Sequence, residues 1–519
     1  MVLSLGMERG NNMLDIIVEK LIHYAQMHLS LDEQDVLYTR NLLLFKLNIE
    51  RPYKGIINIS EIKAMKTPDS LFEELRAEIM RRNLTEEWRI EGLLTDVMGL
   101  LTPSPKLVTD KFRVIYKKDK KAATDYLLDL GIASNYIQKS KIEQNIKWES
   151  TFDDKRLEIT INLAKPEKDN RQIAEEIKKG ANQTDEYPSC PLCKENVGFG
   201  GNFKIPPRQN LRVIPLKLDN NENWFLQYSP YMYYDRHCIV VFDEHLPMVI
   251  SPRTFANLLS FSDQFPHFFI GSNSDLPIVG GSILSHEHFQ GGAPVMPMFE
   301  TGVRQYLKAR YDKRVEIGIL DWFTSVVFIK SANKKLVLEY ASKITEKWID
   351  YRNEELGIIP HTQDDRHNTV TPIVRKVKNN YYFYLILRNN RTDETYPDGI
   401  FHAHPEYHNI KKEGIGLIEQ MGIFILPARL KRQLALIEKA LETKVDVNVL
   451  INDNPDLAVH RTLIDDLSDL TSEKKIHYDK EIRNYVSDVC RNVLINTAVF
   501  KDDVKGQDAF YNFLKSIKY

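Results

Sequence analysis

The sequence has no excess of charge of either sign. Among its 519 residues, Lys and Arg number 70 and Asp and Glu number 72, so the formal net charge is −2. Binding to the phosphates of a long nucleic acid requires a positive excess, so that class of partner is excluded. A small anionic ligand is not excluded, because it needs only a local patch of basic side chains.

Long apolar runs are also absent. No segment approaches the roughly 18 apolar residues that a membrane-spanning helix needs, so we predict no contact with a membrane. Residues 1–15 lack the apolar stretch and the small-residue cleavage site of a secretory signal. We therefore expect a cytoplasmic protein.

Cysteine is scarce. The chain has four, at positions 190, 193, 238 and 490, which is too few for a disulfide scaffold. A reducing compartment agrees with this number. Cys190 and Cys193 form a C-x-x-C pair, and such a pair is available as metal ligands.

The length predicts three or four structural units, at about 100–200 residues for each domain. Helical periodicity dominates residues 1–150, for example over 14–29, 122–131 and a stretch that Ser70 would cap with Glu73 as its capping-box partner. A strand is predicted at 157–163, and the charged residues 165–180 are predicted to form an exposed helix or linker. From about residue 187 the sequence is rich in β pattern, and helices return after residue 413.

The β-rich part repeats its own pattern. Hairpins are predicted at 212–228 and 370–388, with further strands at 237–242, 268–272, 279–284 and 325–330. Each half leads to a His-x-His, at His286–His288 and at His402–His404. Because side chains alternate along a strand, each motif would present two imidazoles on one face. We predict a duplication, with regions 1–150, 151–330, 331–425 and 426–519.

Histidines concentrate in the same β-rich part. Of the 14 histidines, ten lie in two windows, 237–288 and 361–408. The pair Cys190 and Cys193 suits tetrahedral zinc, and His245 and His286 are candidates for the other two ligands. A redox pair and two unrelated thiols are the alternatives. The redox alternative is disfavoured, because no βαβ pattern surrounds the pair.

Residues 280–292, GGSILSHEHFQGG, form the second group with chemical potential. The pattern is not H-E-x-x-H, because Gln290 replaces the second histidine, and it lacks the G-K-S/T of a phosphate-binding loop. An imidazole here can attack phosphorus, and a carboxamide on the same face can donate to the phosphoryl oxygens. The glycines allow close approach of a phosphate. Buried structural histidines with glycine turns are the alternative.

His286-x-His288-x-Gln290 resembles the active-site motif of the histidine-triad superfamily, in its nucleotidyltransferase branch. Further segments make the chain similar to the galactose-1-phosphate uridylyltransferase family, in its second bacterial type. They are residues 157–169, 190–196, 227–248, 282–292 and 401–422. The resemblance implies an α+β fold with a duplicated histidine-triad-like antiparallel β core and helical N-terminal and C-terminal additions.

The resemblance also implies a reaction. His288 would attack the α-phosphorus of UDP-glucose, release glucose 1-phosphate and carry the uridylyl group covalently. Galactose 1-phosphate would then take that group and leave as UDP-galactose, so kinetics would be ping-pong. Gln290 would hold the phosphoryl oxygens, and a backbone carbonyl would fix the tautomer of His288. A homodimer is expected, because relatives build the site across a subunit interface.

The family's zinc ligands match Cys190, Cys193, His245 and His286. His402 and His404 fall where some relatives have a second metal, with Glu300 and Glu406 as further candidate ligands, and a phosphate or sugar contact is the alternative for both histidines. The remaining candidate contacts to substrate are Asn273, Ser282, Asn210, Arg208, Arg212, Lys411 and Lys412. For the two arginines, a solvated surface charge is the alternative.

Two features depart from the family pattern. Glu287 stands between the two histidines, where the first type has proline, and residues 1–150 have no counterpart in that type. Two other functions are kept open. One is a hydrolase or phosphorylase of nucleotide sugars on the same core, and the other is a zinc-stabilised binding protein without turnover.

Overall fold

The structure is a computed structural model. It describes residues 13–163, 187–202, 204–281, 283–293, 295–308, 312–470 and 476–518. The helix or linker predicted for 165–180 lies outside the described residues. In the part of the chain that is described, every helix is too short or too polar to cross a bilayer.

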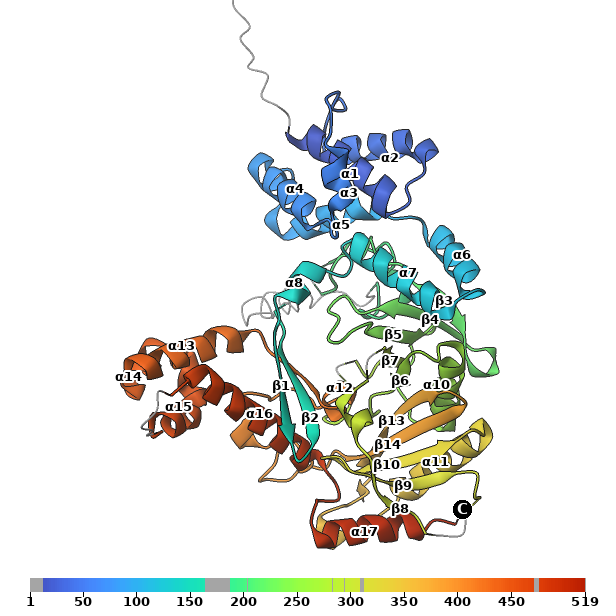
Figure 1. Cartoon of the computed structure of the whole chain (residues 1–519), viewed down its shortest axis with the longest axis vertical. Coiled ribbons are helices and arrows are strands. Elements are labelled where there is room, and N and C mark those ends of the chain that lie inside the picture. The colour runs from blue at the N-terminus through green and yellow to red at the C-terminus, as the bar shows by residue number, and fades with distance from the viewer. Residues whose placement is uncertain are drawn as a thin grey trace, which may run out of the picture. The chain divides into compact units, whose positions relative to one another are not determined.

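The chain divides into two compact units. The first takes its described residues from Met1–Glu143, Lys168–Pro215 and Phe225–Tyr231, and the second from Gln144–Glu167, Leu216–Trp224 and Met232–Tyr519. Helices fill the N-terminal part of the first unit (Figure 1): α1 (Met13–His28), α2 (Glu33–Lys46), α3 (Ile59–Ala64), α4 (Asp69–Arg82), α5 (Ile90–Leu101), α6 (Pro105–Tyr116), α7 (Lys120–Ala133) and α8 (Lys139–Glu143).

The apolar spacing of helix α1 explains why it forms. Leu14, Ile17, Leu21 and Ala25 recur at three- or four-residue intervals, and all four are buried. The predicted cap of α4 is wrong. This helix begins at Asp69 and has Pro68 at its N-cap, so Ser70 already lies within its first turn.

The strands follow the sequence pattern closely. They are β1 (Ile146–Phe152), β2 (Lys155–Ile161), β3 (Ile214–Lys217), β4 (Asn223–Tyr228), β5 (Cys238–Phe242), β6 (Phe269–Gly271), β7 (His288–Gly292), β8 (Val303–Tyr306), β9 (Glu316–Leu320), β10 (Val326–Ser331), β11 (His361–Thr362), β12 (Asp365–Arg366), β13 (Asn368–Val377), β14 (Asn380–Asn389) and β15 (Ile423–Leu426). The strand predicted at 279–284 is wrong for its described residues, where Ile278 with φ 71° introduces a turn.

The large sheet shows the predicted duplication. Its strand order is β3-β4-β5-β7-β6-β13-β14-β10-β9-β8. Numbered along the chain, the first five strands lie in the order 1-2-3-5-4, and β8, β9, β10, β13 and β14 repeat that order from the other edge. A helix follows the third strand in each half: α10 (Pro252–Gln264) after β5 and α11 (Lys334–Ile349) after β10. By this repeat the halves divide between β7 and β8, whereas the predicted division into four regions stays a prediction.

The two His-x-His motifs are not equivalent in this repeat. His288 begins β7, and the strand that corresponds to β7 by order is β14. His402 and His404 lie beyond β14, in irregular backbone before a short 3-10 helix (Pro405–Tyr407). The prediction that both motifs present their imidazoles in the same way is therefore wrong.

The two faces of the large sheet have different coverings. Helices α10 and α11 contact each other and β13 on one face (Figure 1). The other face contributes Phe269, Ile373, Tyr384 and Ile386 to a core that includes the small sheet β1-β2-β15. C-terminal helices complete that unit: α12 (Leu417–Gln420), α13 (Arg429–Thr443), α14 (Val447–Asp453), α15 (Arg461–Ser468), α16 (Tyr478–Thr497) and α17 (Val504–Lys515).

Candidate functional site

Strand β7 places His288 and Gln290 on one face of the sheet. His288 pairs with Val241 of β5, and Gln290 pairs with Ile239 of β5 and with Gly271 of β6. Because side chains alternate along a strand, the imidazole and the carboxamide point to the same side. A Cβ at position 271 would lie 2.9 Å from the Pro372 carbonyl oxygen, so glycine is required beside Gln290.

The His288 ring has a defined tautomer. Its Nδ1 lies 2.8 Å from the carbonyl oxygen of His286. A carbonyl can only accept, so Nδ1 carries the proton and the lone pair is on Nε2. Burial lowers the pKa of His288 to about 4, so the ring is neutral at pH 7. The backbone acceptor expected from the sequence is therefore the carbonyl of His286.

His237 is a site residue that the sequence analysis missed. Its Nε2 lies 3.0 Å from Oε1 of Gln290, and its side chain is buried. With the proton on Nε2, His237 donates to Oε1, so the Gln290 NH₂ points away and can donate elsewhere. Burial lowers the pKa of His237 to about 4. The available signal was the register of β5 on β7, which brings the residue before Cys238 next to Gln290.

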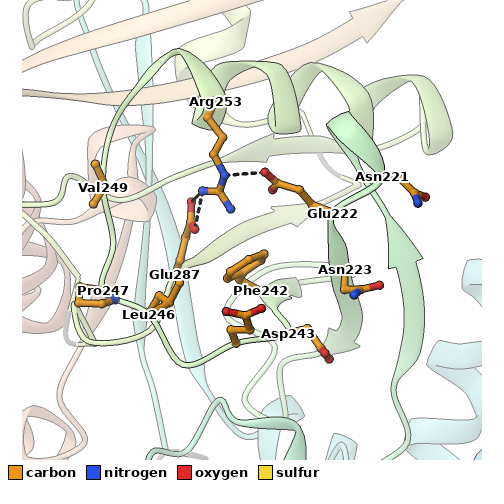
Figure 2. A pocket seen from close by; sticks show the side chains of 11 residues that line it. Asn221, Glu222, Asn223, Phe242, Asp243, Leu246, Pro247, Val249, Arg253 and Glu287 are labelled. Atoms are coloured by element: carbon orange, nitrogen blue, oxygen red, sulfur yellow. Dashed lines mark hydrogen bonds and ion pairs between the residues drawn. The ribbon is translucent and has the colours of Figure 1, made fainter.

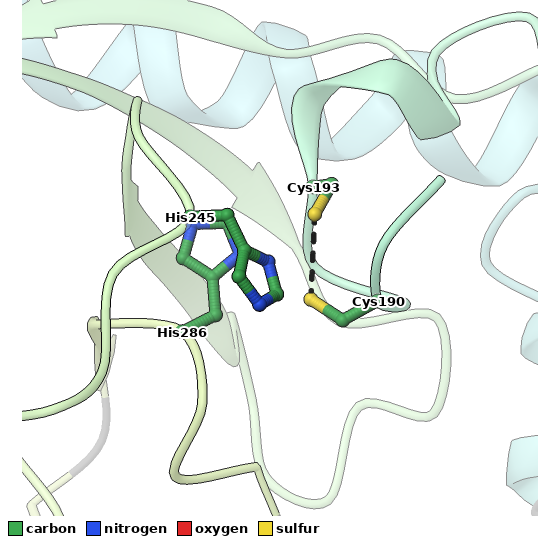
Figure 3. A group of neighbouring side chains, drawn as sticks. All are labelled: Cys190, Cys193, His245 and His286. Atoms are coloured by element: carbon green, nitrogen blue, oxygen red, sulfur yellow. Dashed lines mark hydrogen bonds between the residues drawn. The ribbon is translucent and has the colours of Figure 1, made fainter. Parts of the chain in front are cut away.

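Cys190, Cys193, His245 and His286 form a group that could bind a metal (Figure 3). One ligand atom of each lies within 4.8 Å of the others. The two sulfurs are 3.5 Å apart, close to the roughly 3.8 Å of two thiolates on one tetrahedral zinc. His286 Nε2 lies 2.9 Å from the Phe242 carbonyl oxygen, which makes Nδ1 its ligand atom. The donor set and spacing fit zinc.

The pKa of the Cys193 thiol also bears on metal binding. Burial, together with the neighbouring Cys190, raises the pKa of Cys193 to about 12. A thiolate at this position thus needs a cation beside it. All four cysteines of the chain are free thiols.

Three predicted substrate residues contact one segment, 415–419. Asn273 Oδ1 accepts from the Leu417 N–H at 2.8 Å, and His402 Nε2 accepts from the Ile415 N–H at 3.3 Å. The Lys411 ammonium lies 3.0 Å from a Glu419 oxygen. Asn273 lies in the loop between β6 and β7, whereas His402 and Lys411 follow β14. Their contacts with segment 415–419 therefore link the loop before β7 to the residues that follow β14.

Lys411 is a core residue, which corrects the prediction that it binds the sugar phosphate. Its side chain is 5% exposed, and although burial opposes its charge, Glu419 raises its pKa. An ammonium so placed is already neutralised, so a sugar phosphate gains little from it. Lys412 is exposed and stays a predicted phosphate contact. Ser282 lies outside the described residues.

Arg212 is a packing residue of the first unit, which corrects the prediction that it binds uridine or phosphate. Its guanidinium donates to five backbone carbonyls, those of Gly99, Thr102, Pro103, Gln209 and Leu211. All five N–H donors are thereby engaged, and none is left for a phosphate. Burial lowers the pKa of Arg212 to about 10.

Asn210 and Arg208 also contact their own unit. Asn210 is buried and donates to the Ser134 carbonyl at 2.8 Å. The Arg208 guanidinium lies over the Tyr136 ring, 5.6 Å from its centroid, and is only partly buried. Arg208 therefore stays a predicted nucleotide contact, whereas the amide of Asn210 serves packing.

The predicted second metal site is not assembled in the residues that the structure describes. His404 Nε2 bonds to the Ile400 carbonyl at 3.0 Å, and Glu300 binds Arg156 through both oxygens. Burial, and then the positive charge of Arg388, lower the pKa of His402 to about 4. A buried guanidinium near His402 opposes a second cation there. A Glu406 oxygen lies 3.9 Å from Nδ1 of His404, but among the described residues these two belong to no larger group of candidate metal ligands.

Comparisons with known proteins agree on one family. Residues 77–247 match the N-terminal domain of galactose-1-phosphate uridyl transferase, and residues 261–449 match its C-terminal domain. No solved structure matches the chain.

Curated relatives extend over nearly the whole chain. Galactose-1-phosphate uridylyltransferase of Clostridium acetobutylicum is 42% identical over 504 residues, which cover 96% of this chain and 98% of the relative. The protein of the same name from Caldanaerobacter subterraneus is 42% identical over 513 residues, covering 96% and 97%. The one from Bacillus subtilis is 40% identical over 505 residues, with the same coverage.

Proposed function

The chain belongs to the galactose-1-phosphate uridylyltransferase family, and we propose that it exchanges UMP between UDP-glucose and galactose 1-phosphate through a uridylyl-histidine. It is an enzyme of the transferase class. The observation that carries the covalent route is the His288 ring, which is neutral and has its Nδ1 proton held by the His286 carbonyl.

In the first half-reaction, the lone pair of His288 Nε2 attacks the α-phosphorus of UDP-glucose. A nitrogen–phosphorus bond forms, the bond from phosphorus to the bridging oxygen breaks, and glucose 1-phosphate leaves with the electron pair. The ring becomes positively charged, and the His286 carbonyl stabilises its Nδ1–H. A phosphate oxygen of galactose 1-phosphate then attacks phosphorus, and the lone pair returns to Nε2 as UDP-galactose leaves.

Gln290 would bind the phosphoryl oxygens in both half-reactions. Because His237 occupies its Oε1, the amide NH₂ is left to donate, and the Gln290 side chain lies on the same face of the sheet as His288. No general base is needed, since the attacking oxygen of galactose 1-phosphate is already ionised. The task of Gln290 is electrostatic.

Zinc is the metal that we propose for Cys190, Cys193, His245 and His286. Bound there, the ion would supply a structural link that holds His286, two residues before His288. Resemblance to the family supports a homodimer, and the free thiols support a cytoplasmic enzyme.

A mass measurement tests the covalent route. Protein incubated with UDP-glucose alone and quenched should gain the mass of one UMP, and acid should remove it, as expected for a bond from nitrogen to phosphorus. Absence of the adduct under rapid quench would contradict the route. Sustained release of UMP without an acceptor would instead identify a hydrolase.

A further inference from the structure

An ion pair with a buried carboxylate lies on the opposite face of β7 from His288. Glu287 stands between His286 and His288, and its carboxylate receives two hydrogen bonds from Arg253 of α10, at 2.9 and 2.8 Å. The Nε of Arg253 donates to Glu222 at 2.7 Å. Figure 2 shows the guanidinium between the two carboxylates.

Glu222 is itself anchored. Its Oε2 accepts from the amide of Asn257 at 2.9 Å, also on α10, and from the indole of Trp224 at 3.3 Å. Arg253 also lies over the Phe242 ring, 4.9 Å from its centroid. The guanidinium is therefore held on two sides, and its position determines that of the Glu287 carboxylate.

These groups border a cavity of about 620 Å³. The Glu287 side chain is 5% exposed, whereas that of Arg253 is 37% exposed. A carboxylate that is buried to this extent requires its partner, because an unpaired buried charge is strongly destabilising. Loss of Arg253 would therefore remove the hydrogen bonds that hold the Glu287 carboxylate and release its side chain from this position.

Movement of Glu287 would reach His288 through one peptide plane. The amide that joins His286 to Glu287 is planar, so its C=O and N–H turn together. Its carbonyl accepts from His288 Nδ1 at 2.8 Å, and its N–H donates to the Leu246 carbonyl at 2.7 Å. The backbone carbonyl of Glu287 accepts a further hydrogen bond from the Phe242 N–H at 3.0 Å.

We propose that Arg253, acting through Glu287, is a positioning residue that sets the peptide plane on which the orientation of His288 depends. The proposal rests on the uridylyl transfer proposed above. Arg253 lies on the face opposite to the reacting imidazole and so touches no reacting atom.

The test is the single-turnover rate at which UDP-glucose adds UMP to the protein. Arg253→Met should slow this rate about tenfold or more at saturating UDP-glucose, because small misplacement of a nucleophile is costly. The final stoichiometry, the metal content and the apparent KM should stay near wild type. Arg253→Lys should restore part of the rate, since an ammonium can still reach Glu287.

Arg304→Met is the matched control. Arg304 also bridges two carboxylates, Asp321 and Asp502, and is similarly exposed, but it lies on β8 at the far edge of the sheet. It should lower the melting temperature without changing the rate. If Arg253→Met fails to fold, the nearly isosteric Glu287→Gln serves, with an expected loss of at least about threefold.

Two results would overturn the proposal. One is labelling of folded Arg253→Met, or of Glu287→Gln, at the wild-type rate. The other is a loss of rate that follows a loss of bound metal or that Arg304→Met reproduces. Failure of the wild-type protein to take up UMP would overturn the uridylyl-histidine itself, and that result is distinct from both.

Discussion

The two halves of the large sheet share one strand order but differ in the side chains on their common face. On that face, strand β7 and its neighbour β6 carry glycine at 271 and 292, and β7 adds His288 and Gln290 as functional groups. The corresponding strand β14 carries Tyr384, Ile386 and Arg388, all buried. Small residues therefore lie beside Gln290 in the first half, whereas bulky, buried residues occupy the same face of the second half.

Arg388 illustrates how the second half uses its polar groups. Its Nη2 donates to the Ile415 carbonyl at 2.8 Å, and it is 1% exposed. This contact, like those of His402, Lys411 and Asn273, fastens segment 415–419. The second half of the duplicated scaffold thus uses a buried polar group to hold a loop, whereas the first half carries the proposed site.

The largest expected effect separates the two halves directly. His288→Ala should lower the steady-state transfer rate by more than about 10³-fold, because it removes the proposed nucleophile. His367, which immediately precedes β13, has both ring nitrogens bonded, to Asn390 and to Thr362, at 2.9 Å each. His367→Ala should retain activity. Equal loss in both variants, or turnover near wild type in His288→Ala, would contradict the assignment.

Metal content is the next contrast. Cys190→Ser should lose the bound zinc and lower the melting temperature together, because ligand loss is coupled to folding. Cys490→Ser changes a buried thiol of α16, far along the chain, and should keep the metal. Metal analysis after gel filtration checks both. Unchanged zinc in Cys190→Ser would refute the site.

A buried His–Gln pair occurs twice in the second unit and offers a sharper comparison. His237 bonds to Gln290 at 3.0 Å, and His460 bonds to Gln433 at 3.2 Å among the C-terminal helices. His237→Phe should reduce kcat by roughly 10- to 100-fold, as for loss of an oriented donor. His460→Phe should reduce stability alone. The orienting role of His237 fails if its variant differs from wild type only in stability.

The smallest effect is a dependence of stability on pH. Burial, with Arg388, His408 and Lys411 nearby, lowers the pKa of His402 from 6.5 to about 4 in the folded state. The unfolded chain therefore binds the proton first, so stability is full above pH 6.5 and falls as the pH drops toward 4. Between pH 7.5 and 4.5, wild type should lose about 2 kcal/mol more than His402→Gln in urea unfolding. Parallel curves for the two proteins would contradict this.

Local spacing predicted what lies close along the chain. Cys190 and Cys193 are three residues apart, and His288 and Gln290 are two apart on one strand, so a turn or the strand pleat alone brings each pair together. The hairpins could be predicted equally well, because alternating apolar residues and an intervening turn specify a hairpin locally. The resemblance to a family depended on the same short segments.

Such local patterns could not predict which polar side chains already bond to other groups of the protein. Arg212 has the side chain of a phosphate ligand, yet five backbone carbonyls occupy it. Three of them, those of Gly99, Thr102 and Pro103, are far away in sequence. His237, by contrast, has no motif of its own and acquires its partner only through the pairing of β5 with β7.

The sequence by itself therefore determined the fold class, the duplication, the imidazole–carboxamide strand and the two thiols of the metal group. Tertiary structure decided which cations are neutralised, that Lys411 faces Glu419, and that Arg253 reaches Glu287 from another element. The reason is physical. Alternation and turn geometry act between neighbours in the chain, whereas burial and charge pairing depend on elements that meet only when the chain has folded.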